Sequence, residues 1–523
     1  MLIIGKRNLN KLWEYRAGVH GEKLFLIFED VDGNVVFFSY QEFNDLINRT
    51  ANALLNLGLR QGDKLVLHLP NCPEFLLFWF GLARMGGVMV PTNTLSTADE
   101  LEYILTHSEC VGLVTEPAYL EKFLSILDRC PNIKHVILCR TAKAPPGTLL
   151  FDDLLKDSAD SSALPPGIAV DELTEAAMLY TSGTTARPKG VLITHGNYLY
   201  VGEVMAKHLR LTPEDRQMVV LPLFHANAQY YSFMSALTVG ASVALMERFS
   251  ASRFIHQARR HQATVVSLFA APMRMILNQP PTPVDGDNSL RLAFFAQNLT
   301  QSQLDEFESR FQVPLIQLYG MTETIGVPTI NPVDGPRKNH GIGLPALGYE
   351  VKVVDSNGRE VPPGTVGQII VKGLPGLSLM KGYFKNPEAT AEAVKDGWLY
   401  TGDNAYVDED GYFFFVDRAK DMIKRAGENV ASSEVEMVIN QHPKVFESAV
   451  IGVPDEIRDE AIKAYVVLKA GETATAAEII DFCAQKLSKF KVPSFIEFCD
   501  QLPKTSVGKI QKHILRKEEQ IKS

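Results

Sequence analysis

The stretch YTSGTTARPKGV, which runs from Tyr180 to Val191, decides how the rest of the chain is interpreted. Hydroxyl side chains surround Gly183, and the cations Arg187 and Lys189 follow closely. Glycine lets the backbone approach a ligand, and successive N–H groups in a turn bind anions. Apolar residues stand before and after the stretch, so we expect a polyphosphate-binding loop between two β-strands.

Two other interpretations of this stretch are weaker. A Walker A loop needs Gly-Lys followed by Ser or Thr at the start of a helix, whereas Lys189 here precedes Gly190. An isolated Ser/Thr/Gly cluster is more often a surface hairpin, but a Thr-Ser-Gly-Thr-Thr run that ends in Pro-Lys-Gly is far more specific. The stretch resembles the signature loop of the adenylate-forming superfamily, which includes acyl-CoA synthetases, luciferases and peptide-synthetase adenylation domains.

Size and composition describe a multi-domain globular protein. A chain of 523 residues is too long for one core, and its length suggests roughly two to four domains. The net charge of −9 argues against a general nucleic-acid binder. The six cysteines include no CxxC pair, which favours reduced thiols and a cytoplasmic location. The N-terminus shows no signal-peptide pattern, and the longest apolar run, Phe75 to Ala83, is too short to cross a bilayer.

The order of secondary-structure patterns predicts an α/β multi-domain fold. Residues 1 to about 170 and 172 to about 345 alternate helix and strand patterns, which indicates two α/β subdomains. Ser39 to Glu42 form a capping box before a helix, Pro73 to Met85 a buried helix, and residues 142–167 a Pro- and Gly-rich loop. Short strands over about 348–415 indicate a β-rich subdomain. By resemblance, residues 1–417 form an N-terminal AMP-binding domain, 418–421 a hinge, and 422–523 a small mobile α+β domain.

The segment Tyr319-Gly-Met-Thr-Glu323 follows a predicted strand, Val313 to Leu318, and matches the family's YGxTE motif completely. Taken alone, it would be a strand-to-helix turn capped by Thr322. Tyr319 offers a flat face for a purine, Thr322 offers a hydroxyl, and Glu323 offers a hard oxygen ligand of the kind that Mg²⁺ takes. The motif therefore predicts a nucleotide site with a metal ligand.

A further motif, Gly397-Trp-Leu-Tyr-Thr-Gly-Asp403, matches the family's GWxxTGD pattern. Asp403 is expected in a tight turn after Gly402, where its carboxylate could accept two ribose hydroxyls, and the alternative is an Asx-turn. By resemblance, Arg418 adds a ribose or phosphate contact, and Lys420 stands at the hinge.

Two C-terminal segments carry the rest of the predicted chemistry. In the family, the loop Ile423 to Asn429 borders the tunnel for the pantetheine thiol, so coenzyme A is assigned to Lys424, Arg425, Gly427 and Glu428. The segment Pro503-Lys-Thr-Ser-Val-Gly-Lys509 matches the family pattern that ends in the catalytic lysine. A lone C-terminal lysine is ordinarily solvated surface, but the complete motif makes Lys509 the expected catalytic residue.

The acyl pocket is predicted from two further segments. In LPLFHANAQ, Leu221 to Gln229, a histidine alone would more often be structural, but the family carries a similar segment here, so His225 is expected to place the substrate carboxylate. Where many members carry a Gly-Gly-Ala-like segment, this chain has Phe294-Phe-Ala-Gln-Asn298, which should fill a long acyl tunnel. Aromatic faces and an amide suit a short polar acid, including one with a quaternary ammonium group. The predicted lining is His225, Asn227, Phe294, Phe295, Ala296 and Gln297.

The resemblance covers essentially the whole chain and implies a two-step ligase reaction. A carboxylate attacks the α-phosphate of Mg-ATP to give an acyl-adenylate and pyrophosphate, and the thiol of coenzyme A then displaces AMP. The implied catalytic residues are His225, Thr322, Glu323 and Lys509, and the implied Mg²⁺ ligands are Thr184 and Glu323. The implied ATP and AMP contacts are Thr181, Ser182, Gly183, Thr184, Thr185, Lys189, Tyr319, Gly320, Met321, Thr322, Asp403, Arg418 and Lys509.

Within the superfamily, the chain looks closest to crotonobetaine/carnitine–CoA ligases, on stretches such as Asn71 to Phe75, Phe78 to Ala83, Arg458 to Ala464 and Lys489 to Pro493. Phe294 and Phe295 would then face a trimethylammonium group. A general short- or medium-chain acyl-CoA synthetase shares every motif, and a stand-alone adenylation enzyme would load a carrier protein instead of free coenzyme A. A luciferase-like oxygenase has no specific support, and a non-catalytic binding protein is disfavoured because no key motif residue is missing.

Overall fold

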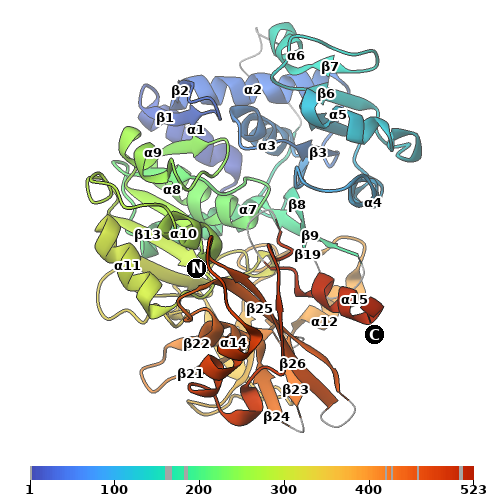
Figure 1. Ribbon diagram of the computed structural model, residues 1–523. Helices are drawn as coiled ribbons and strands as arrows, with labels where there is room; N and C mark the ends of the chain where they lie inside the picture. Colours follow the sequence, from blue (N-terminus) through green and yellow to red (C-terminus); the bar gives the residue numbers. More distant parts are fainter. Residues whose placement is uncertain are drawn as a thin grey trace.

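The computed structural model describes residues 3–158, 168–181, 187–418, 421–425, 428–455, 459–505 and 510–522. In this part of the chain the strands form sheets of nine, eight, five and five strands. The two large sheets come from the first part of the chain, and one small sheet is built entirely from residues after 421. This α/β architecture with a smaller C-terminal part confirms the predicted fold class (Figure 1).

The eight-stranded sheet carries the stretch with which the sequence interpretation began. Its strand order is β19-β9-β8-β4-β3-β5-β6-β7. The strands from β8 through β4 to β7 run parallel, and β9 pairs antiparallel with both β8 and β19. The strands are β3 (Lys64–His68), β4 (Val88–Pro91), β5 (Gly112–Thr115), β6 (His135–Leu138), β7 (Leu149–Leu150), β8 (Glu175–Thr181), β9 (Lys189–Thr194) and β19 (Gly382–Tyr383); the associated helices are α2 (Tyr40–Asn56), α3 (Pro73–Met85), α4 (Ala98–Ser108), α5 (Pro117–Leu124), the 3₁₀ turn η1 (Leu127–Arg129) and α6 (Phe151–Asp157).

The nine-stranded sheet has the order β16-β15-β14-β13-β12-β10-β11-β1-β2. Its six central strands, from β14 to β1, are parallel, so their carboxyl ends meet at one edge, where ligands of α/β proteins bind. The strands are β1 (Leu24–Glu29), β2 (Val35–Ser39), β10 (Arg216–Val219), β11 (Ser242–Met246), β12 (Val265–Phe269), β13 (Leu292–Ala296), β14 (Leu315–Tyr319), β15 (Thr329–Ile330) and β16 (Leu344–Pro345); the associated helices are α1 (Leu9–His20), α7 (His195–His208), the π-helix η2 (Asn227–Phe233), α8 (Met234–Val239), α9 (Phe254–Arg260), α10 (Ala270–Leu277), α11 (Gln301–Phe311) and the 3₁₀ turn η3 (Thr322–Thr324).

Two five-stranded sheets complete the fold. The first pairs β17-β18-β21-β20, with β22 on β21, and the second pairs β24-β23-β26-β25, with β27 on β26. The C-terminal sheet and its helices bury two apolar clusters of their own, and Figure 1 shows these elements together below α1–α6. The elements are β17 (Glu350–Val354), β18 (Gly367–Lys372), α12 (Pro387–Ala393), β20 (Val394–Lys395), β21 (Trp398–Val407), β22 (Phe413–Arg418), β23 (Met422–Arg425), β24 (Glu428–Ala431), α13 (Ser432–Ile439), β25 (Val445–Asp455), β26 (Asp459–Leu468), α14 (Ala476–Ala484), the 3₁₀ turn η4 (Lys489–Lys491), β27 (Phe495–Phe498) and α15 (Lys512–Lys522).

Local sequence signals predict several of these elements well. The Ser39 hydroxyl accepts from the Glu42 N–H and the Glu42 carboxylate accepts from the Ser39 N–H, so the predicted capping box is confirmed. Helix α3 has the predicted bounds and is apolar on all sides, as a helix enclosed by other elements must be. The expectation of a loop over 142–167 is wrong in its middle, because β7 and α6 form there between the prolines.

A cluster of aromatic rings forms the centre of the main core. Trp13 of α1 packs edge-on against Phe25 of β1 and Phe80 of α3, with ring centroids 5.0 and 5.1 Å apart. Phe233, at the end of the π-helix, lies 5.9 Å from Phe25 and 5.5 Å from Phe80. Phe25 belongs to the nine-stranded sheet, the other three rings come from helices, and the same buried cluster includes Leu65 and Leu67 of β3, so the two large sheets share one core.

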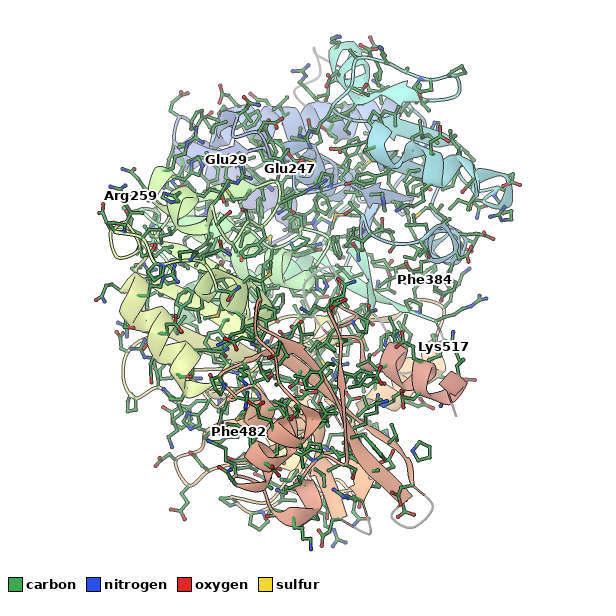
Figure 2. The ribbon with its side chains drawn as sticks, in the orientation of Figure 1. Glu29, Glu247, Arg259, Phe384, Phe482 and Lys517 are labelled. Atoms are coloured by element: carbon green, nitrogen blue, oxygen red, sulfur yellow. The ribbon has the colours of Figure 1, made fainter. Side chains whose placement is uncertain are left out.

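An ion cluster also joins the two large sheets. Arg140 follows β6, and its guanidinium lies 2.8 Å from the Glu116 carboxylate and 3.1 Å from the Glu247 carboxylate. Glu116 follows β5 of the same sheet, whereas Glu247 follows β11 of the other. The Glu247 N–H donates to the Glu29 carbonyl, and both labels lie side by side in Figure 2. Arg140 therefore holds strand ends of both sheets at one place.

Neither a membrane-spanning helix nor a disulfide occurs in the described ranges. The longest apolar helices there are too short or too polar to cross a bilayer. All six cysteines are free thiols, and only Cys499 is partly exposed.

We predict that Arg140→Ala destabilises the fold by about 3 kcal/mol, because it leaves buried carboxylates without their cation. Urea unfolding followed by the fluorescence of the buried Trp13 and Trp79 would measure the change. The control is Lys156→Ala, which removes an exposed ion pair with Asp153 and should have no measurable effect. Equal stability of the two variants would show that the cluster does not hold the sheets together.

Candidate active site

The ends of strands β8 and β9 carry the first predicted site residues. Thr181 is the last residue of β8 and pairs with Lys189, the first residue of β9. The two predicted strands on either side of residues 182–186 are therefore present. The predicted contacts Ser182, Gly183, Thr184 and Thr185 lie outside the described residues.

Glu323 lies buried between these strand ends and β19. The Thr181 hydroxyl donates to its carboxylate at 3.4 Å and the Tyr383 hydroxyl at 3.0 Å. Lys189 places its ammonium 4.4 Å from the centroid of the Tyr383 ring. Burial raises the pKa of Glu323, although these hydrogen bonds and the charge of Lys189 act in the opposite direction. The structure thus brings together three predicted residues, Thr181, Lys189 and Glu323.

Tyr383 belongs to this cluster but was not predicted. It lies on the two-residue strand β19, which pairs with Val191 and Leu192 of β9. No motif marks it in the sequence, because its role comes from the pairing of β19 with a strand far away in the chain. Only the segment Lys381-Gly-Tyr-Phe-Lys385, with basic residues around aromatic ones, gives a weak signal.

A second cluster joins Tyr319, Asp403 and Arg418. The Tyr319 hydroxyl donates to Asp403 Oδ2 at 2.7 Å, and Arg418 Nε lies 3.4 Å from Asp403 Oδ1. The expectation of a tight turn at Asp403 is wrong, because Asp403 lies within strand β21 and pairs with Arg418 of β22. Gly402 has φ 74° at a bulge, where β21 has more residues than its partner β18. The bulge re-aims the carboxylate toward the end of β14.

The YGMTE segment is held tightly by its neighbours. A Cβ at Gly320 would stand 2.3 Å from the Tyr231 hydroxyl and 2.7 Å from the Gly326 carbonyl, so only glycine fits there. Met321, rather than Thr322, occupies the N-cap of the 3₁₀ turn η3, which corrects the alternative interpretation of Thr322 as a cap. Met321 and Thr322 are both half-buried and flank the buried Glu323.

The predicted acyl-pocket residues fall into two groups. His225 is half-buried, and Asn227 begins the π-helix that follows it. The side-chain oxygen Oδ1 of Asn227 accepts from the Ser267 hydroxyl at 2.7 Å. The side-chain nitrogen Nδ2 of Asn227 is also buried, and it has no hydrogen-bond partner among the described residues. π-helical turns are rare and occur often at functional sites.

The second group, on β13, corrects an expectation. Phe294 and Phe295 are successive residues of a strand, so their side chains point to opposite faces of the sheet, and both are completely buried. They cannot both line one pocket. Ala296 ends the strand, and Gln297 adopts φ 76° at the carboxyl edge, where both are half-buried.

The predicted coenzyme A residues are also separated by the structure. Arg425 is buried, and its guanidinium donates to the carbonyls of Phe490 and Val492 and to the Ser494 hydroxyl, so it is occupied by the segment between α14 and β27. The expectation that it offers a charge to coenzyme A is therefore corrected. Lys424 and Glu428 are exposed, and Gly427 lies outside the described residues.

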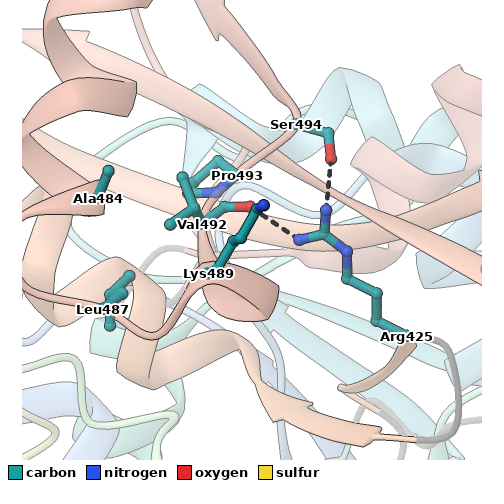
Figure 3. Close-up of a pocket in the computed structure, with 7 residues that line it drawn as sticks. All are labelled: Arg425, Ala484, Leu487, Lys489, Val492, Pro493 and Ser494. Carbon is teal, nitrogen blue, oxygen red and sulfur yellow. Dashed lines mark hydrogen bonds between the residues drawn. The ribbon is translucent and has the colours of Figure 1, made fainter.

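A pocket of about 340 Å³ opens beside Arg425 (Figure 3). Its walls are mainly apolar, and Lys489 adds a positive charge. Such a pocket suits a ligand with an apolar or aromatic part and a negative charge. It is lined by Arg425, Ala484, Leu487, Lys489, Val492, Pro493 and Ser494.

The predicted hinge residue Lys420 and the predicted catalytic Lys509 both lie outside the described residues. The chain on each side of Lys509 is tied to the C-terminal sheet and its helix α13. Lys504 lies 2.6 Å from the Glu447 carboxylate, and Lys512 lies 2.7 Å from the Glu436 carboxylate. The described residues on each side of residues 506–509 thus take part in ion pairs.

Two protein-family models match the chain. The AMP-binding enzyme family matches residues 13–384, and the AMP-binding enzyme C-terminal domain matches residues 434–509. The crotonobetaine/carnitine–CoA ligase of Salmonella agona (strain SL483) is 43% identical over 520 residues, which cover 99% of this chain and 100% of the relative.

Solved structures of ligases superpose on the chain over nearly its full length. The anthranilate CoA ligase AuaEII with anthranoyl-AMP has a TM-score of 0.90 at 28% identity, covering 99% of this chain and 98% of that chain. ATP-bound MatB from Rhodopseudomonas palustris has a TM-score of 0.86 at 30% identity, and the match covers 99% of this chain and 100% of that chain. Apo MatB scores only 0.73 at the same coverage. The chain thus superposes more closely on ATP-bound MatB than on apo MatB.

We predict that Glu323→Gln raises the melting temperature at about pH 7.5, because it removes a buried charge and keeps an acceptor oxygen. A carboxyl whose pKa is raised on folding stabilises the fold only below its unfolded pKa, and this contribution is lost as the pH rises through the folded pKa. The advantage of the variant should therefore shrink as the pH falls toward about 4.3.

Thermal unfolding of both proteins at several pH values measures this difference. Glu392→Gln, on the exposed side of α12, is the matched control. A variant that melts below the wild type at neutral pH would show that Lys189 and the two hydroxyls outweigh the cost of burial.

Proposed function

Because this chain belongs to the AMP-binding enzyme family, we propose that its acid substrate is a short polar carboxylate such as carnitine or crotonobetaine. The chain is an AMP-forming acid–CoA ligase. The substrate proposal rests on one observation. The chain matches a Salmonella ligase named for these two acids at 43% identity over 99% of the chain.

In the first half-reaction, a carboxylate oxygen of the acid attacks the α-phosphorus of ATP. The bond from that phosphorus to the bridging oxygen breaks, pyrophosphate leaves, and an acyl-adenylate remains. Negative charge grows on the phosphate oxygens, so fixed cations and hydrogen-bond donors around them lower the barrier. We assign this role to Lys189, to the Thr181 hydroxyl beside it, and to Lys509.

The surroundings of Glu323 fit a Mg²⁺ ion that is bound mostly by phosphate oxygens and water. Mg²⁺ in such sites takes only one or two carboxylates from the protein. The described residues contain no cluster of three or more His, Cys, Asp or Glu that could hold a metal by itself. Glu323 and Thr184 would hold the ion, which would supply positive charge at the phosphates.

The nucleotide would be held at its other end by the second cluster. The Asp403 carboxylate faces Tyr319 and Arg418, and its oxygens retain lone pairs for ribose hydroxyls. Tyr319 is almost completely buried, so we assign it to orienting Asp403 through its hydroxyl.

The surroundings of Asn227 support the proposal that the substrate is a polar acid. A buried amide nitrogen without a partner costs about 1–3 kcal/mol, and a ligand oxygen that accepts from it would relieve this cost. The hydroxyl of carnitine would serve, whereas crotonobetaine, which has no hydroxyl, and a plain alkyl chain would not. The face of β13 offers at most one of its two phenylalanines to the same ligand.

In the second half-reaction, the sulfur of coenzyme A attacks the acyl carbon, and the bond from that carbon to the phosphate oxygen breaks to release AMP. The thiol proton leaves to solvent. We propose that Lys424, Gly427 and Glu428 border the thiol, and that the pocket beside Lys489 receives an acidic part of coenzyme A (Figure 3). The higher TM-score to ATP-bound than to apo MatB supports an arrangement suited to the first half-reaction, with movement near Lys420 before the second.

We predict that AMP release with Mg-ATP and free coenzyme A is fastest for carnitine and crotonobetaine in a panel that also holds γ-butyrobetaine, butyrate and octanoate. In Asn227→Leu, kcat/KM for carnitine should fall at least tenfold while that for butyrate changes little, because only carnitine loses a hydrogen bond. Preference for plain fatty acids would remove the substrate proposal and leave the ligase reaction. If pyrophosphate exchange occurs but AMP is not released when coenzyme A is added, the acceptor is a carrier protein.

We also predict that Lys509→Ala slows acyl-adenylate formation by roughly 10²–10³-fold, as the loss of a charge-stabilising donor does elsewhere. Thioester formation from supplied acyl-AMP should continue, because pyrophosphate has already left. Each half-reaction is assayed separately, with the exposed Lys517→Ala as control. Equal loss of both half-reactions would contradict the assignment of Lys509.

A further inference from the structure

Helix α4 lies against the strand ends that carry Thr181 and Lys189. Tyr103 and His107 are four residues apart, so they lie on one face of the helix. The Tyr103 hydroxyl donates to the Pro188 carbonyl at 2.9 Å, and His107 Nδ1 lies 2.7 Å from the Tyr180 hydroxyl. One helix face therefore contacts the residue before Thr181 and the residue before Lys189.

Ring contacts strengthen both attachments. The Arg187 guanidinium lies 5.1 Å from the centroid of the Tyr103 ring, which is a cation–π contact. Tyr103 and His107 stack on each other with centroids 5.2 Å apart, and Tyr180 packs edge-on against both rings. The two strand ends are thus joined to the helix by hydrogen bonds and to each other through a shared group of rings.

The same helix reaches the third segment that meets Glu323. Phe384, labelled in Figure 2, packs edge-on against His107 with centroids 5.8 Å apart, and its N–H donates to the Gly190 carbonyl. Lys385 pairs with Glu109 at the end of α4 at 2.5 Å. The residue before Phe384 is Tyr383, which donates to Glu323. Every described segment that brings a side chain to the Glu323 carboxylate is therefore adjacent to a contact with α4.

We propose that Tyr103 and His107 are positioning residues for ATP: they fix the strand ends so that Thr181 and Lys189 meet Glu323 at the geometry that the phosphates need. This inference rests on the proposed function of that cluster. A hydrogen bond and an ammonium contribute to binding only if their direction is set before the ligand arrives, because ordering them later costs conformational entropy. Helix α4 supplies that order from outside the nucleotide site.

The packing of α4 separates this role from general stability. Leu101, Ile104 and Leu105 face the core from the other side of the helix and are buried. Tyr103 and His107 are only half-buried. Tyr103→Phe keeps the ring under Arg187 and the packing of the helix, and it removes one hydroxyl alone.

The test compares Tyr103→Phe with Tyr119→Phe, in which the same atom is removed from a tyrosine that packs on the same small core from α5. We expect Tyr103→Phe to raise both KM and Kd for Mg-ATP about fivefold, because a factor of that size corresponds to the loss of one hydrogen bond. The melting temperature, kcat at saturating ATP and thioester formation from supplied acyl-AMP should stay as in wild type. His107→Phe, which keeps the stacked ring and loses the bond to Tyr180, should act in the same direction, and the double variant should exceed either single one.

The outcomes distinguish this inference from the proposed function. If the wild type binds Mg-ATP and makes AMP, but Tyr103→Phe has the ATP affinity of the Tyr119→Phe control, the inference fails and the function stands. If Tyr103→Phe lowers both half-reactions equally together with the melting temperature, the two residues only stabilise the fold, and the inference is overturned. If the wild type binds no Mg-ATP, the proposed function of the cluster fails first.

Discussion

The buried carboxylate of Glu323 needs hydrogen-bond donors, and the chain supplies them from segments that are far apart in sequence. Thr181 comes from β8 and Tyr383 from β19, while the backbone carbonyl of Glu323 accepts from the N–H of Met380 at 2.9 Å. A charge in such surroundings is tolerated only when its partners are held in place. The position of β19 beside β9 and the attachment of α4 to both strand ends follow from this requirement.

The placement of the site also follows from the direction of the strands. In the nine-stranded sheet, β10, β13 and β14 are parallel and end at one edge, so the segments with His225, Gln297 and Tyr319 emerge together. Strand β8 of the other large sheet ends at Thr181. Because the shared aromatic core and the Arg140 cluster hold the two sheets in register, the carboxyl edges face a common space. Arg140 thus supports the geometry of the site without belonging to it.

The sequence predicted the fold class and three residues of the Glu323 cluster, Thr181, Lys189 and Glu323, because their signals are local. The capping box at Ser39, the apolar run of α3 and the YGMTE segment are each complete within a few residues. Predictions that depended on long-range pairing were weaker. The turn at Asp403 became a bulged strand because β18 and β22 pair with it on both sides.

The errors at single side chains have the same origin. Arg425 looked like a free cation, but the backbone carbonyls that occupy it lie more than sixty residues further on. Tyr103, His107 and Tyr383 carry no motif, since each acts through a segment that only the folded chain brings near. The expectation that Phe294 and Phe295 form one aromatic surface is wrong, because the alternation of β13 divides them between two faces.

The π-helix after His225 is closed by hydrogen bonds between residues five apart, instead of the four of an α-helix, so the segment holds one residue more than α-helical turns would need. Deleting one residue between β10 and α8 would let the segment close as an ordinary α-turn and would swing Asn227 by about 100° around the helix axis. The bond from Tyr198 to Gln229 shows that the far side of this helix is anchored to α7, so the sheets need not move. A single deletion there would therefore change which side chain stands in the place of Asn227 without moving the sheets.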